Sequence, residues 1–190
     1  MESTPGARCF GDGDPLYERY HDEEWGVPVH GDRALYERMS LEAFQSGLAW
    51  ITVLRKREGF RAAFADFDPA VVAEYDESDV HRLMSDAGII RNRAKILATI
   101  ANARALLALQ RDGRSLDTIF WSHATPVADR VPPATYADVP AVTPASTALA
   151  KELKKAGFRF VGPTTAYAAM QACGLVDDHL ATCPVVLART

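Results

Sequence analysis

Four side chains of the types that bind zinc lie at the two ends of the chain, two near each end. Cys9 and His21 flank a turn-rich stretch near the start, and His179 and Cys183 lie four residues apart near the end. Two thiols and two imidazoles form a complete tetrahedral set, and no other grouping in the sequence supplies four soft ligands. If the two pairs meet, one ion joins the ends, and everything between them belongs to one closed unit.

Spacing alone leaves this interpretation open, because the two pairs are remote in sequence. In the simpler alternative, Cys9 is a free thiol and each histidine is a surface residue. At positions i and i+4, His179 and Cys183 would lie on one face of a helical turn, which Pro184 would end. A set of two Cys and two His leaves no open coordination position, so it favours a structural ion. Cys173 lies among Ala and Met in a helical pattern, and we expect it in the core.

Length and composition fit one globular domain spanning residues 1–190. Of these 190 residues, 48% are hydrophobic, which is ordinary for a folded protein, and no apolar run approaches a membrane span. Three cysteines without an export signal are typical of the reducing cytoplasm, where we expect the protein. The formal charge of -4 does not support nucleic-acid binding. It does not exclude it either, since local potential governs docking.

Apolar residues recur every three or four positions nearly throughout, and no stretch alternates as a strand would. Asp32 can cap one helix, and Asp68-Pro69 and Thr143-Pro144 each pair a cap with a proline at the first helical position. The longest periodic segment is 91–113, and 126–140 is proline-rich and predicts a surface connection. Further helices are expected at 50–64, at 78–88 (opened by Ser78), at 143–157 and at 163–173, with a helical turn at 16–20. The sequence therefore predicts an all-α bundle of short helices.

Five motifs in this order resemble the bacterial 3-methyladenine DNA glycosylase I family. They are YHDEEWGVP at 20–28, LEAFQSGLAWITVL at 41–54, DAGIIRNRAKI at 86–96, KKAGFRFVGPTT at 154–165 and MQACGLVDDH at 170–179. The resemblance covers nearly the whole chain. It implies the helix-hairpin-helix glycosylase fold as a single domain, with the hairpin at about 154–165. It also implies one structural zinc ion that joins the ends 9–21 and 179–183, with Cys9, His21, His179 and Cys183 as its ligands.

The activity implied by the resemblance is monofunctional hydrolysis of the bond between 3-methyladenine and its sugar in alkylated DNA, which leaves an abasic site. Such an enzyme takes the base out of the stack. Because this base is cationic, aromatic faces and a carboxylate can both select it. By resemblance, Glu42 accepts hydrogen bonds from the base, Trp50 stacks on it and Tyr20 is a further contact. Glu42 and Trp50 fall near one face if their helix is continuous.

Simpler interpretations of these residues stay open. Trp50, and Trp25, which also matches a family aromatic, could be ordinary core. Glu42 could lie on a solvated helix face, although its apolar neighbours favour a buried edge. Phe10 follows Cys9 in a segment where relatives can carry a Trp downstream, which leaves the local path of this segment open.

Two segments are expected to contact DNA. The resemblance suggests Leu48, next to Gly47, as an apolar wedge that fills the gap left by the flipped base. The hairpin brings glycines close to a phosphate, and the helix that follows presents free N–H groups. The residues expected to bind DNA are Gly47, Leu48, Gly157, Phe158, Gly162, Thr164 and Thr165. In the simpler alternatives, Leu48 is core and the hairpin is a plain glycine-capped link.

Asp177 has two interpretations. Many relatives in the wider superfamily use an Asp in this region to stabilise the developing sugar cation. Alternatively, Asp177 is an N-terminal helix cap that leads into the zinc turn. A lyase activity would need a lysine that forms a Schiff base. Lys95, Lys151, Lys154 and Lys155 occupy positions that indicate helix surface or phosphate contact, so none is a clear candidate.

The partners implied are double-stranded alkylated DNA and free 3-methyladenine as the product, with no membrane association and a monomeric protein. Two other functions are weighed against this one. A zinc-clasped module could sense damaged DNA without cleaving it, although an intact set of Glu42, Tyr20 and Trp50 weighs against that. A zinc hydrolase could use Glu23 or Glu24 near the ion, provided that one ligand were absent or exchangeable.

Overall fold

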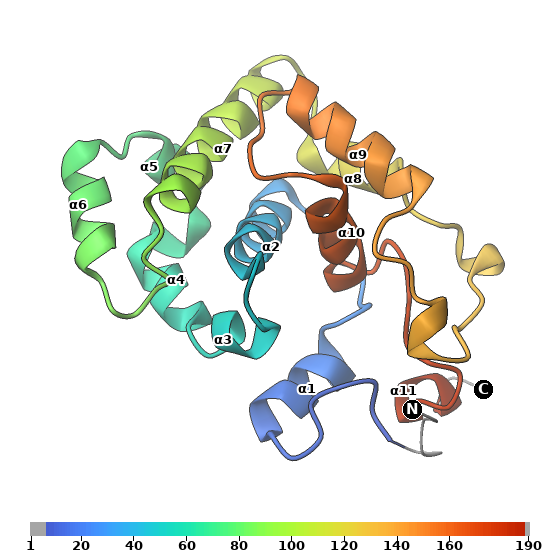
Figure 1. Cartoon of the computed structure of the whole chain (residues 1–190). Coiled ribbons are helices and arrows are strands. Elements are labelled where there is room, and N and C mark those ends of the chain that lie inside the picture. Colours follow the sequence, from blue (N-terminus) through green and yellow to red (C-terminus); the bar gives the residue numbers. More distant parts are fainter. Residues whose placement is uncertain (1–6, 189–190) are drawn as a thin grey trace.

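The computed structural model describes residues 7–188 as a helical protein, with no strand in that range (Figure 1). The prediction of an all-α protein is therefore confirmed, while residues 1–6 and 189–190 of the expected 1–190 domain lie outside the described part. The helices are α1 (Pro15–Glu23), α2 (Asp32–Gln45), α3 (Trp50–Leu54), α4 (Arg57–Ala63), α5 (Pro69–Ala73), α6 (Glu77–Ser85), α7 (Arg93–Arg111), α8 (Leu116–Trp121), α9 (Pro144–Lys155), α10 (Pro163–Ala172) and α11 (Pro184–Leu187). Short 3-10 turns lie at η1 (Ala65–Phe67), η2 (Val127–Asp129) and η3 (Tyr136–Asp138). None of the helices within 7–188 combines the length and apolarity needed to cross a membrane.

Helix α2 occupies the centre of the molecule. Figure 1 shows α4 to α7 on one side of it and α8 to α10 on the other, and α2 packs against α7, α8 and α10. The core around it is strongly aromatic, and Tyr36, Phe44, Phe60, Phe64 and Phe67 are fully buried. Each such side chain contributes roughly 1.5–3 kcal/mol through burial. The described segments around Cys9 and Cys183 meet near α1 and α11, in a small cluster separate from this core.

The helix starts agree only in part with the capping signals. Asp68 caps α5 through its side chain, as predicted, and α9 begins at the predicted Thr-Pro pair. Helix α6 begins after Asp76, whose carboxylate accepts the N–H of Ser78, so the cap predicted at Ser78 is wrong by two positions. Asp32 is the first residue of α2 and not its cap, because its carboxylate accepts the N–H of Asp117. In α6 a nearby carboxylate takes the cap, and at Asp32 a backbone N–H remote in sequence takes the carboxylate.

Two predicted helices are interrupted. The expected helix at 50–64 is two helices, α3 and α4. Helix α2 ends before Ser46, which leaves the helical conformation with a ψ of 116°, and Gly47 follows with a φ of 84°. Glu42 and Trp50 therefore do not share one continuous helix. The chain turns between them, and the turn exposes residues 46–49 on the surface.

The C-terminal segment also differs from the prediction. His179 and Cys183 do not share a helical turn, since residues 177–180 are irregular. Pro184 begins α11 and does not end a helix, with Cys183 at the N-cap. Proline is favoured at the first helical position, because its missing N–H would have no partner there. Helix α8 has no counterpart among the predicted helices, although Ser115 caps it through its side chain.

Candidate active site and metal-binding cluster

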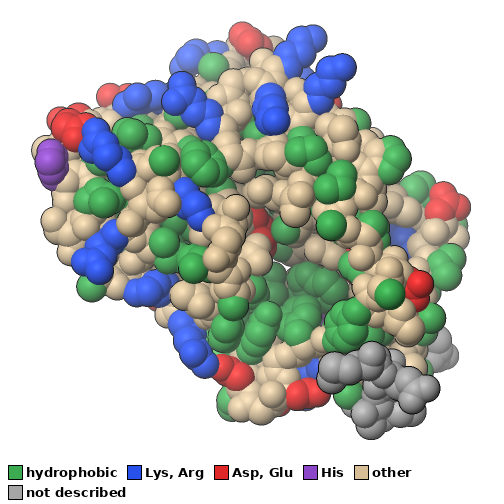
Figure 2. All heavy atoms as spheres, viewed as in Figure 1, with side chains coloured by type: hydrophobic (Ala, Val, Ile, Leu, Met, Phe, Trp, Pro, Cys, Tyr) green, Lys and Arg blue, Asp and Glu red, His purple; other side chains and the backbone are tan. Residues whose placement is uncertain are grey.

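A cavity of about 170 Å³ opens where α1, α2, α3 and α10 meet. Figure 2 shows a hollow on this face, with hydrophobic side chains around it. The lining residues are Phe10, Tyr17, Tyr20, Trp25, Glu42, Gln45, Trp50, Ala168 and Gln171. A larger groove of about 680 Å³ lies between α6, α7 and the turn after α9, but no buried ionisable group lines it. The smaller cavity is the one equipped for chemistry.

Glu42 is the buried acidic group of this cavity. Its side chain is 5% exposed, and within residues 7–188 no donor hydrogen-bonds its carboxylate. Burial raises the pKa of Glu42 to about 8, although the charge of Arg38, one helical turn earlier, lowers it. A buried carboxylate without a hydrogen-bond partner is costly. It is therefore available to a ligand that brings donors or positive charge.

Aromatic rings form the walls around Glu42. The rings of Tyr20 and Trp50 lie 5.2 Å apart at 42°, and those of Phe10 and Trp25 lie 5.0 Å apart at 76°. Burial, followed by the negative charge of Glu42, raises the pKa of Tyr20, so this phenol stays protonated. The buried Trp50 Nε1 has no hydrogen-bond partner within the described residues. The cavity thus combines aromatic faces with one carboxylate.

A cluster of charged side chains joins the end of α1 to α2 and α4. Glu24 follows α1 and accepts hydrogen bonds from Arg38 of α2 at 2.7 Å and from Arg57 of α4 at 2.5 and 2.9 Å. Burial alone would raise the pKa of Glu24, but the two guanidinium groups outweigh burial and lower it. The network fixes α1 against α2 and α4. Tyr20, which lines the cavity with Glu42, lies on α1.

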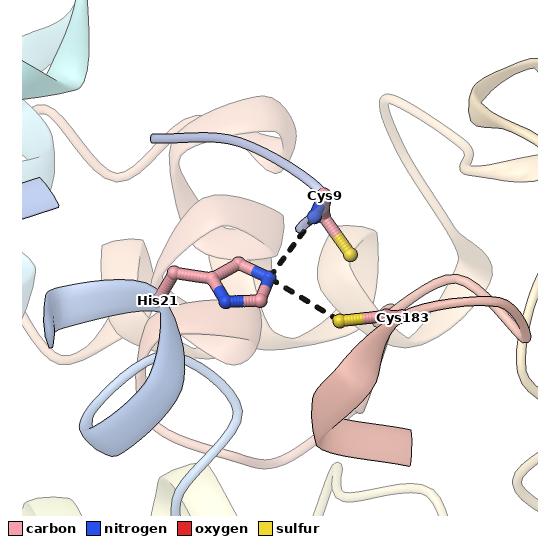
Figure 3. Close-up of side chains that lie close together, drawn as sticks. All are labelled: Cys9, His21 and Cys183. Atoms are coloured by element: carbon pink, nitrogen blue, oxygen red, sulfur yellow. Dashed lines mark hydrogen bonds between the residues drawn. The ribbon is translucent and has the colours of Figure 1, made fainter. Parts of the chain in front are cut away.

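The two ends of the chain form a second buried cluster beside the cavity. Cys9, His21 and Cys183 offer ligand atoms that all lie within 4.8 Å of one another (Figure 3). His21 Nε2 accepts the Cys9 N–H at 3.2 Å and lies 3.5 Å from Cys183 Sγ. Burial raises the pKa of the Cys9 thiol to about 12 and lowers that of His21, which favours the neutral imidazole.

His179 lies next to this cluster but not within it. Its ring centroid is 4.8 Å from that of His21, and its Nε2 lies 3.3 Å from the His21 carbonyl oxygen. Both histidines contact a carboxylate through Nδ1, Asp22 at 2.8 Å for His21 and Asp177 at 2.6 Å for His179. A carboxylate at Nδ1 leaves Nε2 as the ligand atom, which is the usual arrangement around zinc-binding histidines. The donor types therefore fit a zinc ion.

The segments expected to contact DNA lie largely on the surface. Gly47 and Leu48 occupy the exposed 46–49 loop, and Leu48 is 41% exposed, which excludes the core interpretation. The turn between α9 and α10 exposes Gly157 and has residues with positive φ at Gly157 (94°) and Phe160 (55°). Phe158, by contrast, is buried at 3% exposure, and Phe160 exposes its ring at 44%.

Comparison with known proteins identifies the family. A model of the methyladenine glycosylase family matches residues 10–186. The chain belongs to this family. It is 51% identical to DNA-3-methyladenine glycosylase 1 of Escherichia coli (strain K12) over 170 residues, which cover 90% of this chain and 91% of that protein.

Solved structures of methyladenine glycosylases share the fold. A crystal structure of 3-methyladenine DNA glycosylase I is 51% identical and superimposes with a TM-score of 0.90, covering 94% of this chain and 98% of that one. The Staphylococcus aureus 3-methyladenine DNA glycosylase I, solved to explain its recognition of 3-methyladenine, is 36% identical with a TM-score of 0.87. It covers 93% and 94% of the two chains.

In this methyladenine glycosylase, Asp177 contacts His179 and does not line the cavity. Its Oδ1 lies 2.6 Å from His179 Nδ1 and also accepts the His179 N–H. Asp177 is absent from the cavity lining and caps no helix. The neighbouring Asp178 accepts hydrogen bonds from Tyr167 at 2.6 Å and Gln171 at 2.7 Å. Neither carboxylate shares the cavity with Glu42.

Several site residues lie outside the set chosen from the sequence. Gln45 lies three residues after Glu42, and Tyr17 lies three residues before Tyr20, so helical spacing could have identified both. Phe10 and Gln171 come from remote segments and carry no such signal. Lys95 is expected on the helix surface or at a phosphate, and this prediction is wrong. Its side chain is 8% exposed and donates hydrogen bonds to backbone carbonyls.

Proposed function

We propose that this protein excises 3-methyladenine from alkylated double-stranded DNA, as the first step of base-excision repair. The observation that carries the proposal is the carboxylate of Glu42, buried inside an aromatic cavity with no hydrogen-bond donor among the described residues. The relatives, a DNA-3-methyladenine glycosylase and an enzyme whose structure explains its recognition of 3-methyladenine, agree with it.

The cavity selects the damaged base by charge. A base flipped out of the stack enters the cavity that Tyr20 and Trp50 line, where the faces of these rings attract a cation. Glu42 accepts charge-assisted hydrogen bonds from the base edge. Because burial raises the pKa of Glu42 to about 8, ionising it is costly unless a positive charge lies beside it. A neutral adenine brings no such charge, so the same cavity disfavours it.

Cleavage then needs little acid assistance, since the methylated base is already a cationic leaving group. The oxygen of a water molecule bonds to the sugar carbon and releases one proton to the solvent. The base leaves as a neutral molecule with the electrons of the broken bond, and an abasic site remains. No lysine lines the cavity within the described residues, so we expect hydrolysis without a Schiff-base step.

Two surface segments are proposed to hold the DNA. Leu48, on the exposed 46–49 loop, fills the gap left by the flipped base. Helices α9 and α10 with residues 156–162 between them form the helix-hairpin-helix element, in which Gly157, Gly162, Thr164 and Thr165 approach a phosphate. We extend this surface to Phe160, since its ring is the exposed one. The protein is expected to act as a monomer in the cytoplasm.

The cluster at the chain ends is proposed to hold one structural zinc ion. Cys9, His21 and Cys183 supply three ligands, and His179 is the proposed fourth, supported by its position beside His21 and by its Asp177 partner. A bound ion would add folding free energy and fix α1, which carries Tyr20, against the C-terminal segment. The residues of the cavity carry the chemistry.

Chromatography of the bases released from methylated DNA tests the proposed activity. We expect release of 3-methyladenine with 7-methylguanine retained. Glu42→Gln should lower kcat/KM by about 10- to 100-fold, the equivalent of one charged hydrogen bond. The exposed Glu74→Gln is the matched control and should match the wild type. Binding of alkylated DNA without release of any base would support a damage-sensing module instead.

A further inference from the structure

Helix α7 carries three buried polar residues on one face. Lys95 is 8% exposed, and Thr99 and Asn102 are each 2% exposed. Positions 95, 99 and 102 are spaced as i, i+4 and i+7, so they line one stripe of the helix. Two of the three residues reach backbone atoms of the segments proposed to contact DNA.

Lys95 holds the end of α2 and the start of the 46–49 loop. Its Nζ donates hydrogen bonds to the carbonyl oxygens of Phe44 at 3.0 Å and Ser46 at 2.7 Å. The last turn of α2 contains no basic residue of its own. Lys95 therefore supplies, from another helix, the cation that a helix C-terminus favours. Leu48 lies two residues beyond the second of these carbonyls.

Asn102 holds the turn between α9 and α10 in a similar way. Its Nδ2 donates to the Arg159 carbonyl oxygen at 3.1 Å, and its Oδ1 accepts the Arg159 N–H at 2.7 Å. Arg159 precedes Phe160, whose positive φ of 55° is unusual for a residue with a side chain. This paired contact fixes the backbone on which the exposed ring of Phe160 depends.

The position of Lys95 disfavours its positive charge, and its hydrogen bonds to carbonyl oxygens offset this cost. It is the third residue of α7, near the positive end of that helix dipole, and burial lowers its pKa. Its burial and its two carbonyl partners leave it no role as a direct phosphate contact. Thr99, between the two residues, binds α2 through its carbonyl oxygen, which accepts the Tyr36 hydroxyl at 2.9 Å.

We infer that Lys95 and Asn102 are positioning residues that hold the 46–49 loop and the 156–162 turn at a fixed separation along α7. This inference rests on the proposed function, because it assigns both segments to DNA contact. Seven residues of α-helix span about 10 Å, so one rigid element sets the spacing at which the wedge and the hairpin meet the same duplex.

Lys95→Met and Asn102→Leu remove these hydrogen bonds and keep side chains of similar size. We expect each to lower kcat/KM on methylated duplex DNA by about tenfold, while the Kd for free 3-methyladenine stays within about twofold of wild type. Arg111→Met is the matched control, since it removes a cation from the exposed end of the same helix. It should leave both quantities unchanged. Lys95→Arg keeps the cation and its donors and should restore most of the lost excision.

Double-mutant cycles assign each residue to its segment. The Lys95→Met effect should largely disappear in a Leu48→Ala background and persist with Phe160→Ala, and the Asn102→Leu effect should show the opposite pattern. Full additivity in all four combinations would overturn the inference, as would a parallel loss of affinity for the free base. If Lys95→Met does not fold, Lys95→Arg and the Asn102 cycles still decide between these outcomes. A wild-type protein that releases no 3-methyladenine would refute the proposed function itself, whatever the variants do.

Discussion

Glu42 shows at the scale of one residue how a cost in stability can serve recognition. It is buried among aromatic rings, and burial raises its pKa to about 8 from an ordinary value of 4.5. The native state therefore holds a proton on Glu42 at pH values where the unfolded chain has lost it. Arg38 offsets part of this cost from one helical turn away. A cationic base would offset more, and that difference is the proposed basis of selectivity.

The pH dependence of stability follows with a definite sign. Between pH 4.5 and about 8 the native state binds more protons than the unfolded state, so the Glu42 contribution to stability falls as pH rises through this window. Glutamine does not ionise. The melting temperature of Glu42→Gln should therefore rise relative to that of the wild type between about pH 5 and about pH 8.5. Thermal unfolding across this range measures the gain, with the exposed Glu74→Gln as control. An equal difference between wild type and Glu42→Gln at both pH values would show that the carboxyl is not buried as described.

At the scale of elements, the two segments proposed to contact DNA lie where helices end. The 46–49 loop follows α2, the 156–162 turn follows α9, and both project from helices that are fixed in the core. Close packing between elements holds these helices in place. Gly59 in α4 approaches the turn before α7 so closely that a Cβ atom there would overlap the carbonyl oxygen of Gly88. This contact keeps α4 against the segment that leads into α7.

Gly59→Ala should therefore destabilise the protein by about 1–3 kcal/mol, since the obstructing atom belongs to the backbone and cannot rotate away. Urea denaturation monitored by circular dichroism measures the change. Gly162→Ala is the control for stability, because a Cβ there meets nothing within 4 Å and the φ of -66° suits alanine. Equal stabilities for Gly59→Ala and the wild type would mean that α4 and this turn are not in contact.

At the scale of the whole molecule, the two ends close the structure beside the cavity. Cys9 and Cys183 are separated by nearly the whole chain, yet both lie in one buried cluster with His21. His21 follows Tyr20 directly, so whatever fixes the cluster also fixes a wall of the cavity. This link connects the proposed zinc ion to recognition of the base without placing the ion in the reaction.

Removal of the proposed ion should loosen the whole domain. We expect one zinc per chain by elemental analysis, and Cys183→Ala should abolish it and lower the melting temperature. For a chain of this size, a loss of only ~3 kcal/mol corresponds to about 6–12 °C. Cys173→Ala, at a buried thiol outside the cluster, is the control and should keep the metal. A wild type without zinc whose melting temperature matches that of Cys183→Ala would refute the site.

The sequence by itself determined the helical class, the capped starts of α5 and α9, and the residue types that a zinc site and a cation-selective cavity need. Each of these depends on local spacing or on side-chain chemistry.

Only the tertiary structure decided which residues meet. Glu42 and Trp50 face one cavity because the chain turns at Ser46 and Gly47, and not because one helix carries both. Asp177 contacts His179 and leaves the cavity to Glu42. Lys95 points into the protein because α2 ends beside it, a contact between residues about fifty positions apart that no local pattern encodes.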